Sequence, residues 1–237
     1  MLATDEGGCM SFPLPCRILA LTISALLFWH PSSTTPSRHV VLVSIDGLAA
    51  YHLENEELEL PNLRELIVQG AWADASQTVF PSVTHPSHAT LVTGVSPRQH
   101  GVLGNRMTNR ETGASFHVSS RTRKEAIRVR TLFDAAHEKG LVTAAVCWPE
   151  TRGDVSIDFN LLHGHEELDP GDVDPGLLAE LREAGIPIDS YYDWSKEGGT
   201  QGYRDLLRAK AATHLIQQHR PHLLAVHLMV TDSTQHA

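Results

Sequence analysis

The chain has 237 residues, of which 41% are hydrophobic and 20% are charged, which is an ordinary globular composition with room for one α/β domain. Its formal net charge of −9 argues against a protein that coats nucleic acid or an anionic membrane surface. The charge does not exclude phosphate substrates, because a bound metal can supply positive charge locally.

The first 38 residues have the pattern of an export leader. An uncharged apolar run, ILALTISALLFW, follows Arg17 and precedes a linker rich in Pro, Ser and Thr. The run has the length of a signal-peptide core and is short for a bilayer span. We therefore expect residues 1–38 to be a signal peptide or membrane anchor with a linker, and the protein to be exported (periplasmic, secreted or membrane-anchored). A buried N-terminal helix is the alternative.

Cysteine usage limits the kinds of metal site that the chain can build. Cys9 and Cys16 lie in or before the leader, so only Cys147 remains in the rest of the chain. No internal disulfide and no zinc knuckle of the CxxC type is expected. A metal would have to be held by carboxylates and imidazoles.

From residue 39 onward, buried strands alternate with helices. Apolar strands are predicted at HVVLVSIDG (39–47), LVTAAVCW (141–148) and HLLAVHLMV (222–230). Helices are predicted at PNLRELIVQG (61–70), HATLVTG (88–94), TLFDAAHEKG (131–140) and 202–220, and an acidic loop at 161–176. This alternation predicts a mainly parallel sheet flanked by helices on both faces, with functional residues at the carboxyl ends of the strands.

Two aspartates lie where that rule predicts function. Asp46 ends the first strand, and Asp232 follows the last strand, with His236 four residues further on. A single aspartate in such a place is commonly a cap or turn residue, but two of them with a histidine indicate a metal site. Thr84 precedes an expected helix in a turn between prolines; it is either an N-cap or part of a phosphate-binding helix start.

Four ordered motifs carry a resemblance to a known family. VSIDG, VTHPSHATLVTG, HGVLGN and TDSTQH together resemble the nucleotide pyrophosphatase/phosphodiesterase (type I phosphodiesterase) family of the alkaline phosphatase superfamily. The resemblance covers residues 39–237 and implies an alkaline phosphatase-like catalytic domain. It also implies a hydrolase that cleaves phosphodiester or pyrophosphate bonds of a small-molecule substrate.

The resemblance assigns a role to each candidate site residue and implies two zinc ions. Asp46 would bind the zinc that activates Thr84, and Thr84 would be the nucleophile that forms a phospho-threonine intermediate. Asn105 would hydrogen-bond a phosphate oxygen, and Asp232 and His236 would bind the second zinc. A metal is needed because a threonine hydroxyl is too weakly acidic to attack at neutral pH.

On this resemblance both zinc sites lack ligands, since catalytic zinc normally takes three protein ligands. We therefore expect residues 39–237 to be the N-terminal part of the catalytic domain, with the C-terminal part missing. The isolated chain is expected to be inactive or weakly active, unless other residues such as His85 or His88 complete the site. Apolar surface around HLLAVHLMV is expected to be exposed.

The chain also departs from the family pattern. His85 replaces the phenylalanine that stacks on the base in nucleotide-cleaving members, and Ser87 replaces a common asparagine, so nucleotide preference is not predicted. A sulfatase is disfavoured because Thr84 cannot become formylglycine. A phosphomonoesterase or phosphonate hydrolase of the same superfamily, or a non-catalytic binding module, remain the alternatives.

The other histidines are interpreted as structural. Those on or beside helices are expected to be solvated, and His227 is expected to be a core histidine of the last strand. The helix-associated histidines are His137, His214, His219 and His222.

Overall fold

The computed structural model describes residues 38–162, 174–192 and 201–236. Almost all of the predicted leader, and residues 163–173 of the predicted acidic loop, lie outside these ranges. Within them, no helix combines the length and the apolar character needed to cross a bilayer.

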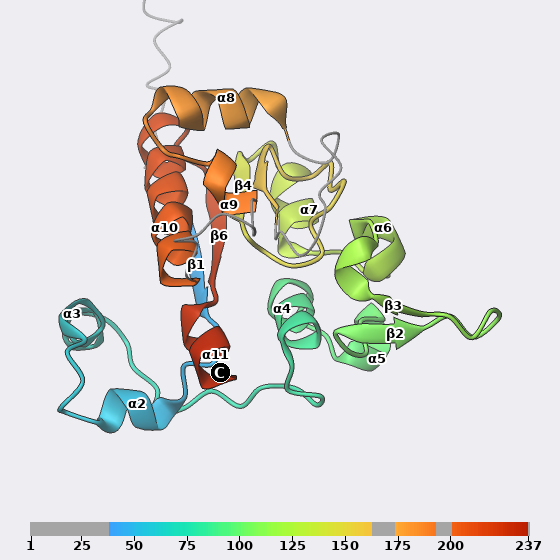
Figure 1. Cartoon of the computed structure of the whole chain (residues 1–237), viewed down its shortest axis with the longest axis horizontal. Helices are drawn as coiled ribbons and strands as arrows, with labels where there is room; N and C mark the ends of the chain where they lie inside the picture. The colour runs from blue at the N-terminus through green and yellow to red at the C-terminus, as the bar shows by residue number, and fades with distance from the viewer. Residues whose placement is uncertain (1–37, 163–173, 193–200, 237) are drawn as a thin grey trace, which may run out of the picture. The chain divides into compact units, whose positions relative to one another are not determined.

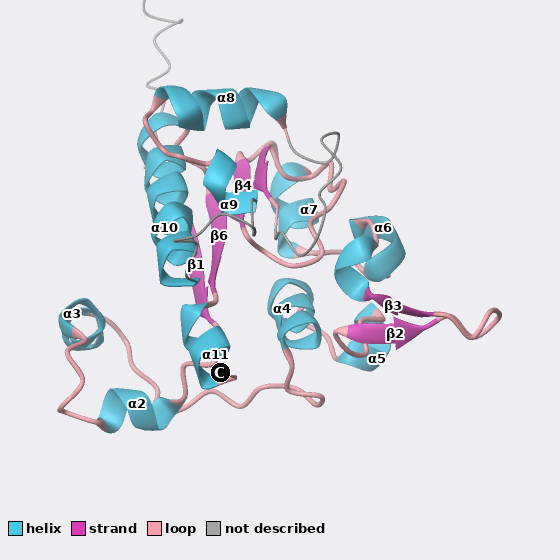
Figure 2. Ribbon diagram, viewed as in Figure 1, coloured by secondary structure: helices cyan, strands magenta, loops and turns pink. Residues whose placement is uncertain are grey.

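A four-stranded sheet forms the centre of the domain. Its strands follow the order β1 (Val40–Ile45), β6 (Leu223–Leu228), β4 (Thr143–Val146) and β5 (Phe159–Leu161). All neighbouring strands are parallel, so their carboxyl ends share one rim (Figure 2). In this register Ser44 of β1 lies opposite His227 of β6. The predicted α/β class with a parallel sheet is confirmed.

Within the described residues, helices occur from α2 near the amino end to α11 near the carboxyl end (Figure 1). Their bounds are α2 Ala50–Glu54, α3 Pro61–Gln69, α4 Thr84–Thr93, α5 Pro97–His100, α6 Arg123–Ala126, α7 Leu132–His137, α8 Pro175–Glu183, α9 Asp189–Tyr192, α10 Gln201–Gln218 and α11 Val230–Gln235, with a 3-10 turn at Val118–Ser120.

Alternate residues of the central strands pack against helices on opposite faces of the sheet. Val146 and Leu224 belong to a core that α8 and α10 complete with leucines such as Leu177 and Leu215. Their strand neighbours Ala145 and Ala225 instead pack with Val92 of α4, Phe133 of α7 and Trp148. The period of two along each strand therefore builds two cores, with helices covering both faces as predicted.

Exposure along the sheet differs from the sequence-based expectation. The strand within HLLAVHLMV lies between β1 and β4, and its central residues are buried, so the expected exposure of apolar surface does not fall on this strand but on its neighbour. The exposed apolar strand is β1 at the edge, where Val40, Val41 and Val43 are about half exposed. The expectation that β1 is covered on both faces therefore does not hold for the described residues.

Several elements were missed from the sequence. A hairpin of β2 (Arg106–Thr108) and β3 (Ser115–His117) forms a second, antiparallel sheet, and β5 is too short to give a pattern. The predicted loop at 161–176 also contains the start of α8. Asp174 caps this helix by accepting a hydrogen bond from the backbone N–H of Gly176, and Pro175 occupies the first turn, where its missing N–H costs nothing.

Candidate active site

The carboxyl end of β1 and the start of α4 meet at Asp46 and Thr84. Asp46 follows the last residue of β1, and the Thr84 Oγ1 hydroxyl donates a hydrogen bond of 2.9 Å to Asp46 Oδ2. Val83 is the N-cap of α4, and Thr84 is its first helical residue. The alternative interpretation of Thr84 as an ordinary N-cap is therefore wrong, because its hydroxyl contacts a carboxylate across 38 residues of sequence.

Two buried histidines lie beside Asp46. His88, one helical turn after Thr84, and His227 of β6 each offer a ring nitrogen, and these atoms and an Asp46 oxygen all lie within 4.8 Å of one another. The Nδ1 of His227 lies 3.2 Å from the Cys147 carbonyl, and the Nδ1 of His88 lies 2.7 Å from the Thr84 carbonyl. A histidine whose Nδ1 is held by a carbonyl keeps its Nε2 directed at the site, which is the usual arrangement of a metal ligand.

The electrostatics of this cluster is that of a buried ion pair. Burial acts to raise the pKa of Asp46, but the hydrogen bond and charge of His227, with help from His88 and Thr84, outweigh it and lower that pKa to about 2. Burial acts to lower the pKa of His227, but its hydrogen bonds to Asp46 and the Cys147 carbonyl raise it to about 9. Asp46 is therefore a carboxylate at neutral pH.

One carboxylate and two neutral imidazoles form a donor set that zinc accepts in proteins, so binding of an ion here would displace the proton that His227 carries at neutral pH. With the Thr84 hydroxyl, Asp46, His88 and His227 fit a metal ion at this position. The sequence predicted only two donors here, Asp46 and Thr84, whereas the structure also places His88 and His227 close enough to bind the same ion. His227 is a buried strand histidine, as predicted, but its Nε2 also faces Asp46 at 3.3 Å.

Asn105 is attached to the same helix start. Its side-chain Oδ1 accepts a 3.1 Å hydrogen bond from the backbone N–H of His85, the residue after Thr84. Its backbone carbonyl accepts a 2.9 Å hydrogen bond from the N–H of Val118, which holds the turn in place. Because Oδ1 is the acceptor, the amide Nδ2 keeps two N–H donors for a ligand beside Thr84.

Asp232 and His236 lie in α11 at the same rim. Asp232 Oδ1 and His236 Nε2 are 3.3 Å apart, and the His236 side chain is 79% exposed. The backbone of Asp232 rests on Gly47, where a Cβ would lie 2.7 Å from the Asp232 Cα, and Gln235 Nε2 donates a 2.8 Å hydrogen bond to the Gly47 carbonyl. The turn after Asp46 therefore fixes the position of Asp232.

The Asp232–His236 pair has fewer donors than the Asp46 cluster. In the part of the chain that the structure describes, no third His, Cys, Asp or Glu joins these two residues in a group within 4.8 Å. Asp232 and His236 thus supply two donors from this region, as the sequence indicated.

His85 does not take the place of a base-stacking side chain. It is 2% exposed, its Nδ1 bonds Glu150 Oε1, and its ring meets that of His117 edge-on with centroids 4.9 Å apart. His85 is therefore held inside the protein and does not supply a stacking surface. It also lies outside the donor group around Asp46.

Sequence reasoning named His88 only as a residue that could complete the site, and it missed His227 and Glu150 as neighbours of the site. A signal existed for His88, because residues four apart lie on one face of a helix and Thr84 had already been singled out. No sequence pattern near His227 or Glu150 predicts that they lie beside the site. His227 is placed there by the pairing of β1 with β6, and Glu150 by the return of the chain to α4 after β4.

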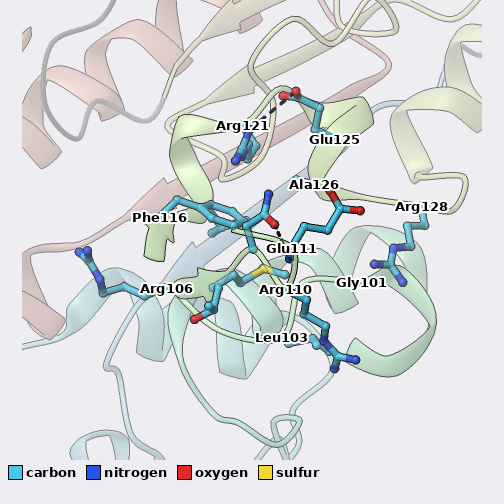
Figure 3. Close-up of a pocket in the computed structure, with 14 residues that line it drawn as sticks. Gly101, Leu103, Arg106, Arg110, Glu111, Phe116, Arg121, Glu125, Ala126 and Arg128 are labelled. Carbon is cyan, nitrogen blue, oxygen red and sulfur yellow. Dashed lines mark hydrogen bonds and ion pairs between the residues drawn. The ribbon is translucent and has the colours of Figure 1, made fainter. Parts of the chain in front are cut away.

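A large cavity lies beside the hairpin rather than over Thr84. Its volume is about 940 Å³, and Figure 3 shows the arginines at its wall, which come from the hairpin and from the residues on either side of α6. The guanidinium of Arg121 lies 4.3 Å from the centroid of the Phe116 ring. None of the five sequence-predicted site residues lines this cavity. Its arginines are Arg106, Arg110, Arg121 and Arg128.

The sequence of the chain matches a known protein family. Residues 40–237 match the model of the type I phosphodiesterase / nucleotide pyrophosphatase family. The chain is 31% identical over 126 residues to the bis(5'-adenosyl)-triphosphatase enpp4 of Xenopus laevis, which covers 53% of this chain and 26% of that protein.

Two solved structures share the fold. Murine ectonucleotide pyrophosphatase/phosphodiesterase 5, an inactive variant in complex with AMP, aligns with a TM-score of 0.56 and 19% identity over 84% of this chain and 45% of that chain. Phosphonoacetate hydrolase from Sinorhizobium meliloti 1021, in complex with phosphonoacetate, aligns with a TM-score of 0.56 and 21% identity over 84% of this chain and 48% of that chain.

The fold is therefore of the alkaline phosphatase type. The chain belongs to the type I phosphodiesterase/nucleotide pyrophosphatase family, whose members are metal-dependent hydrolases. It spans about a quarter of the length of the frog relative and less than half of each of these solved chains.

Proposed function

We propose that this protein hydrolyses phosphodiester or pyrophosphate bonds of a small-molecule phosphoester, with Thr84 as nucleophile. The observation that carries the proposal is the hydrogen bond of the Thr84 hydroxyl to Asp46, at the first residue of α4. A partly buried carboxylate at this distance orients the hydroxyl by accepting its hydrogen bond.

The reaction proceeds in two displacements at phosphorus. The Thr84 oxygen forms a bond to phosphorus as the bond to the leaving oxygen breaks. The hydroxyl proton passes to water, and the leaving oxygen takes a proton from water. Water then attacks phosphorus of the phospho-threonine, which still carries the other substituent; the bond from Thr84 to phosphorus breaks, and a phosphomonoester is released. Nδ2 of Asn105 donates to a non-bridging oxygen and stabilises charge that develops in both transition states.

Two zinc ions are the cofactors that these donors suit. Asp46, His88, His227 and the Thr84 hydroxyl would hold one ion, and Asp232 with His236 would contribute to the other. A bound zinc ion supplies Lewis-acid stabilisation of oxygen charge at neutral pH.

The buried position of His85 affects which substrates the site can bind. Because His85 is bonded to Glu150 inside the protein, it does not provide a ring for a nucleobase. This observation, with the structural likeness to phosphonoacetate hydrolase, favours a phosphonate hydrolase as the second candidate function. A non-catalytic module that binds phosphate is the third.

Export is the proposed location, with contact to a membrane only through an N-terminal anchor. It is supported by the apolar run at residues 18–29 and by the likeness to murine ectonucleotide pyrophosphatase/phosphodiesterase 5.

The test compares Thr84→Ala with Thr93→Ala, which removes a hydroxyl from the other end of the same helix. In a full-length form of the protein, with bis(p-nitrophenyl) phosphate as substrate, Thr84→Ala should lose at least about a thousandfold in kcat, because only positioning and electrostatic stabilisation remain. Thr93→Ala should stay close to the wild-type rate. Mass spectrometry of acid-quenched wild-type protein should find a p-nitrophenyl phosphoryl group on Thr84.

Three results separate the alternatives. Full activity in Thr84→Ala removes Thr84 from the mechanism. Turnover of phosphonoacetate but not of the diester would favour the phosphonate hydrolase. Phosphate binding without turnover of either compound would identify a binding module.

A further inference from the structure

A second group of metal-type donors lies away from Thr84. Glu180 of α8, His214 of α10 and His219, the residue after the C-terminal end of α10, offer three donor atoms within 4.8 Å of one another. Both histidines direct Nε2 at the same carboxylate oxygen, Glu180 Oε1, at 2.6 and 2.7 Å. His214 and His219, which were expected to be solvated, are only partly exposed and are paired with Glu180.

Packing holds these side chains in place before any ion binds. Leu177 and Leu181 of α8 and Leu215 of α10 are buried in one core, so the two helices are fixed against each other around the cluster. The ring of His219 lies against Phe159 of β5, with centroids 3.9 Å apart. The side chains of His214 and His219 are 15% and 25% exposed, which leaves water access to the cluster.

The cluster is separate from the proposed active site. His219 precedes β6, and Phe159 begins β5, so His219 lies toward the amino ends of the strands. Asp46 and Asp232 follow the carboxyl ends of β1 and β6. In a parallel sheet these are opposite rims.

We propose that Glu180, His214 and His219 bind a divalent transition-metal ion of the zinc class, which links α8 to α10. Two imidazoles and one carboxylate are an established zinc donor set, and water can fill the fourth position. A tetrahedral ion would place its ligand atoms about 3.3 Å apart. The present separations of 2.6 and 2.7 Å need only a small outward shift of side chains that are partly exposed. The ion's role is structural, because it joins two helices that share a core.

The test measures thermal stability and cobalt absorption in the full chain. The double variant Asp46→Ala/Asp232→Ala serves as background, since it removes a carboxylate from each proposed active-site metal position. In this background, zinc at about 100 times its Kd should raise Tm by about 5–10 °C. Co²⁺ should give the intense visible absorption of a tetrahedral site.

Added variants in the same background assign the effect to the cluster. Glu180→Gln keeps an oxygen that accepts both imidazole N–H groups, so it should fold with a near-normal Tm without zinc yet lose most of the zinc-induced rise. His214→Ala should also lose it. His137→Ala, a control at an exposed histidine of α7, should keep the full rise.

Two results would overturn the proposal. Absence of a zinc-induced rise in the background variant would identify the cluster as a hydrogen-bonded group only. An undiminished rise in both Glu180→Gln and His214→Ala would place the ion elsewhere.

Discussion

Gly47→Ala is expected to be the most costly glycine substitution at the rim of the sheet. Gly47 has φ of +74°, a left-handed conformation that costs alanine about 1–2 kcal/mol. A Cβ would also lie 2.7 Å from Cα and 2.8 Å from N of Asp232, well inside the usual contact distance of about 3.5–4.0 Å. Both contacts are to backbone, so no flexible side chain can move aside.

The clash has little room to relax. The backbone N–H of Asp46 bonds the Leu228 carbonyl at 2.9 Å, and Gln235 bonds the Gly47 carbonyl at 2.8 Å, so both sides of the contact are held. Overpacking of this kind costs about 1–3 kcal/mol, which with the conformational strain gives a loss of about 2–5 kcal/mol. That is a large fraction of the stability of a typical domain.

Gly140→Ala provides the matched control. Gly140 has φ of +68°, but a Cβ there would meet nothing within 4 Å, so only the strain of about 1–2 kcal/mol should remain. Urea denaturation gives both free energies of unfolding, and hydrogen exchange should show faster exchange of the α11 amides in Gly47→Ala alone. A Gly47→Ala loss no larger than that of Gly140→Ala would refute the reasoning.

Three further substitutions test the contacts that hold the site residues in place and the proposed role of Asn105. Glu150→Ala should lower the free energy of unfolding by about 1–3 kcal/mol, because it leaves His85 buried without its carboxylate; an unchanged urea midpoint would contradict this pairing. Asp205→Ala should lower it by about 2–4 kcal/mol, since Asp205 accepts the backbone N–H groups of Met229 and Val230 where α11 begins; loss of α11 protection in hydrogen exchange is the specific readout. Asn105→Ala should lower kcat about 10²-fold on the diester substrate with the fold intact by circular dichroism, and an equal rate would remove its role as a donor.

The sequence by itself predicted the fold class because its signals are local and repeated. Apolar runs that end in Asp46 and near Asp232 predict parallel strands, and the helical pattern before β6 matches α10 closely. The motif around Thr84 predicted a helix start, and α4 begins at that residue. The assigned roles of these residues remain predictions.

Tertiary structure alone decided which other side chains surround them. His227 reaches Asp46 only because β6 pairs with β1, and His214 and His219 meet Glu180 only because α8 packs on α10. The exposure of β1 and the burial of β6 likewise follow from strand order, which an apolar run does not encode. Contacts between residues distant in sequence depend on which elements pair, and neither composition nor periodicity specifies that pairing.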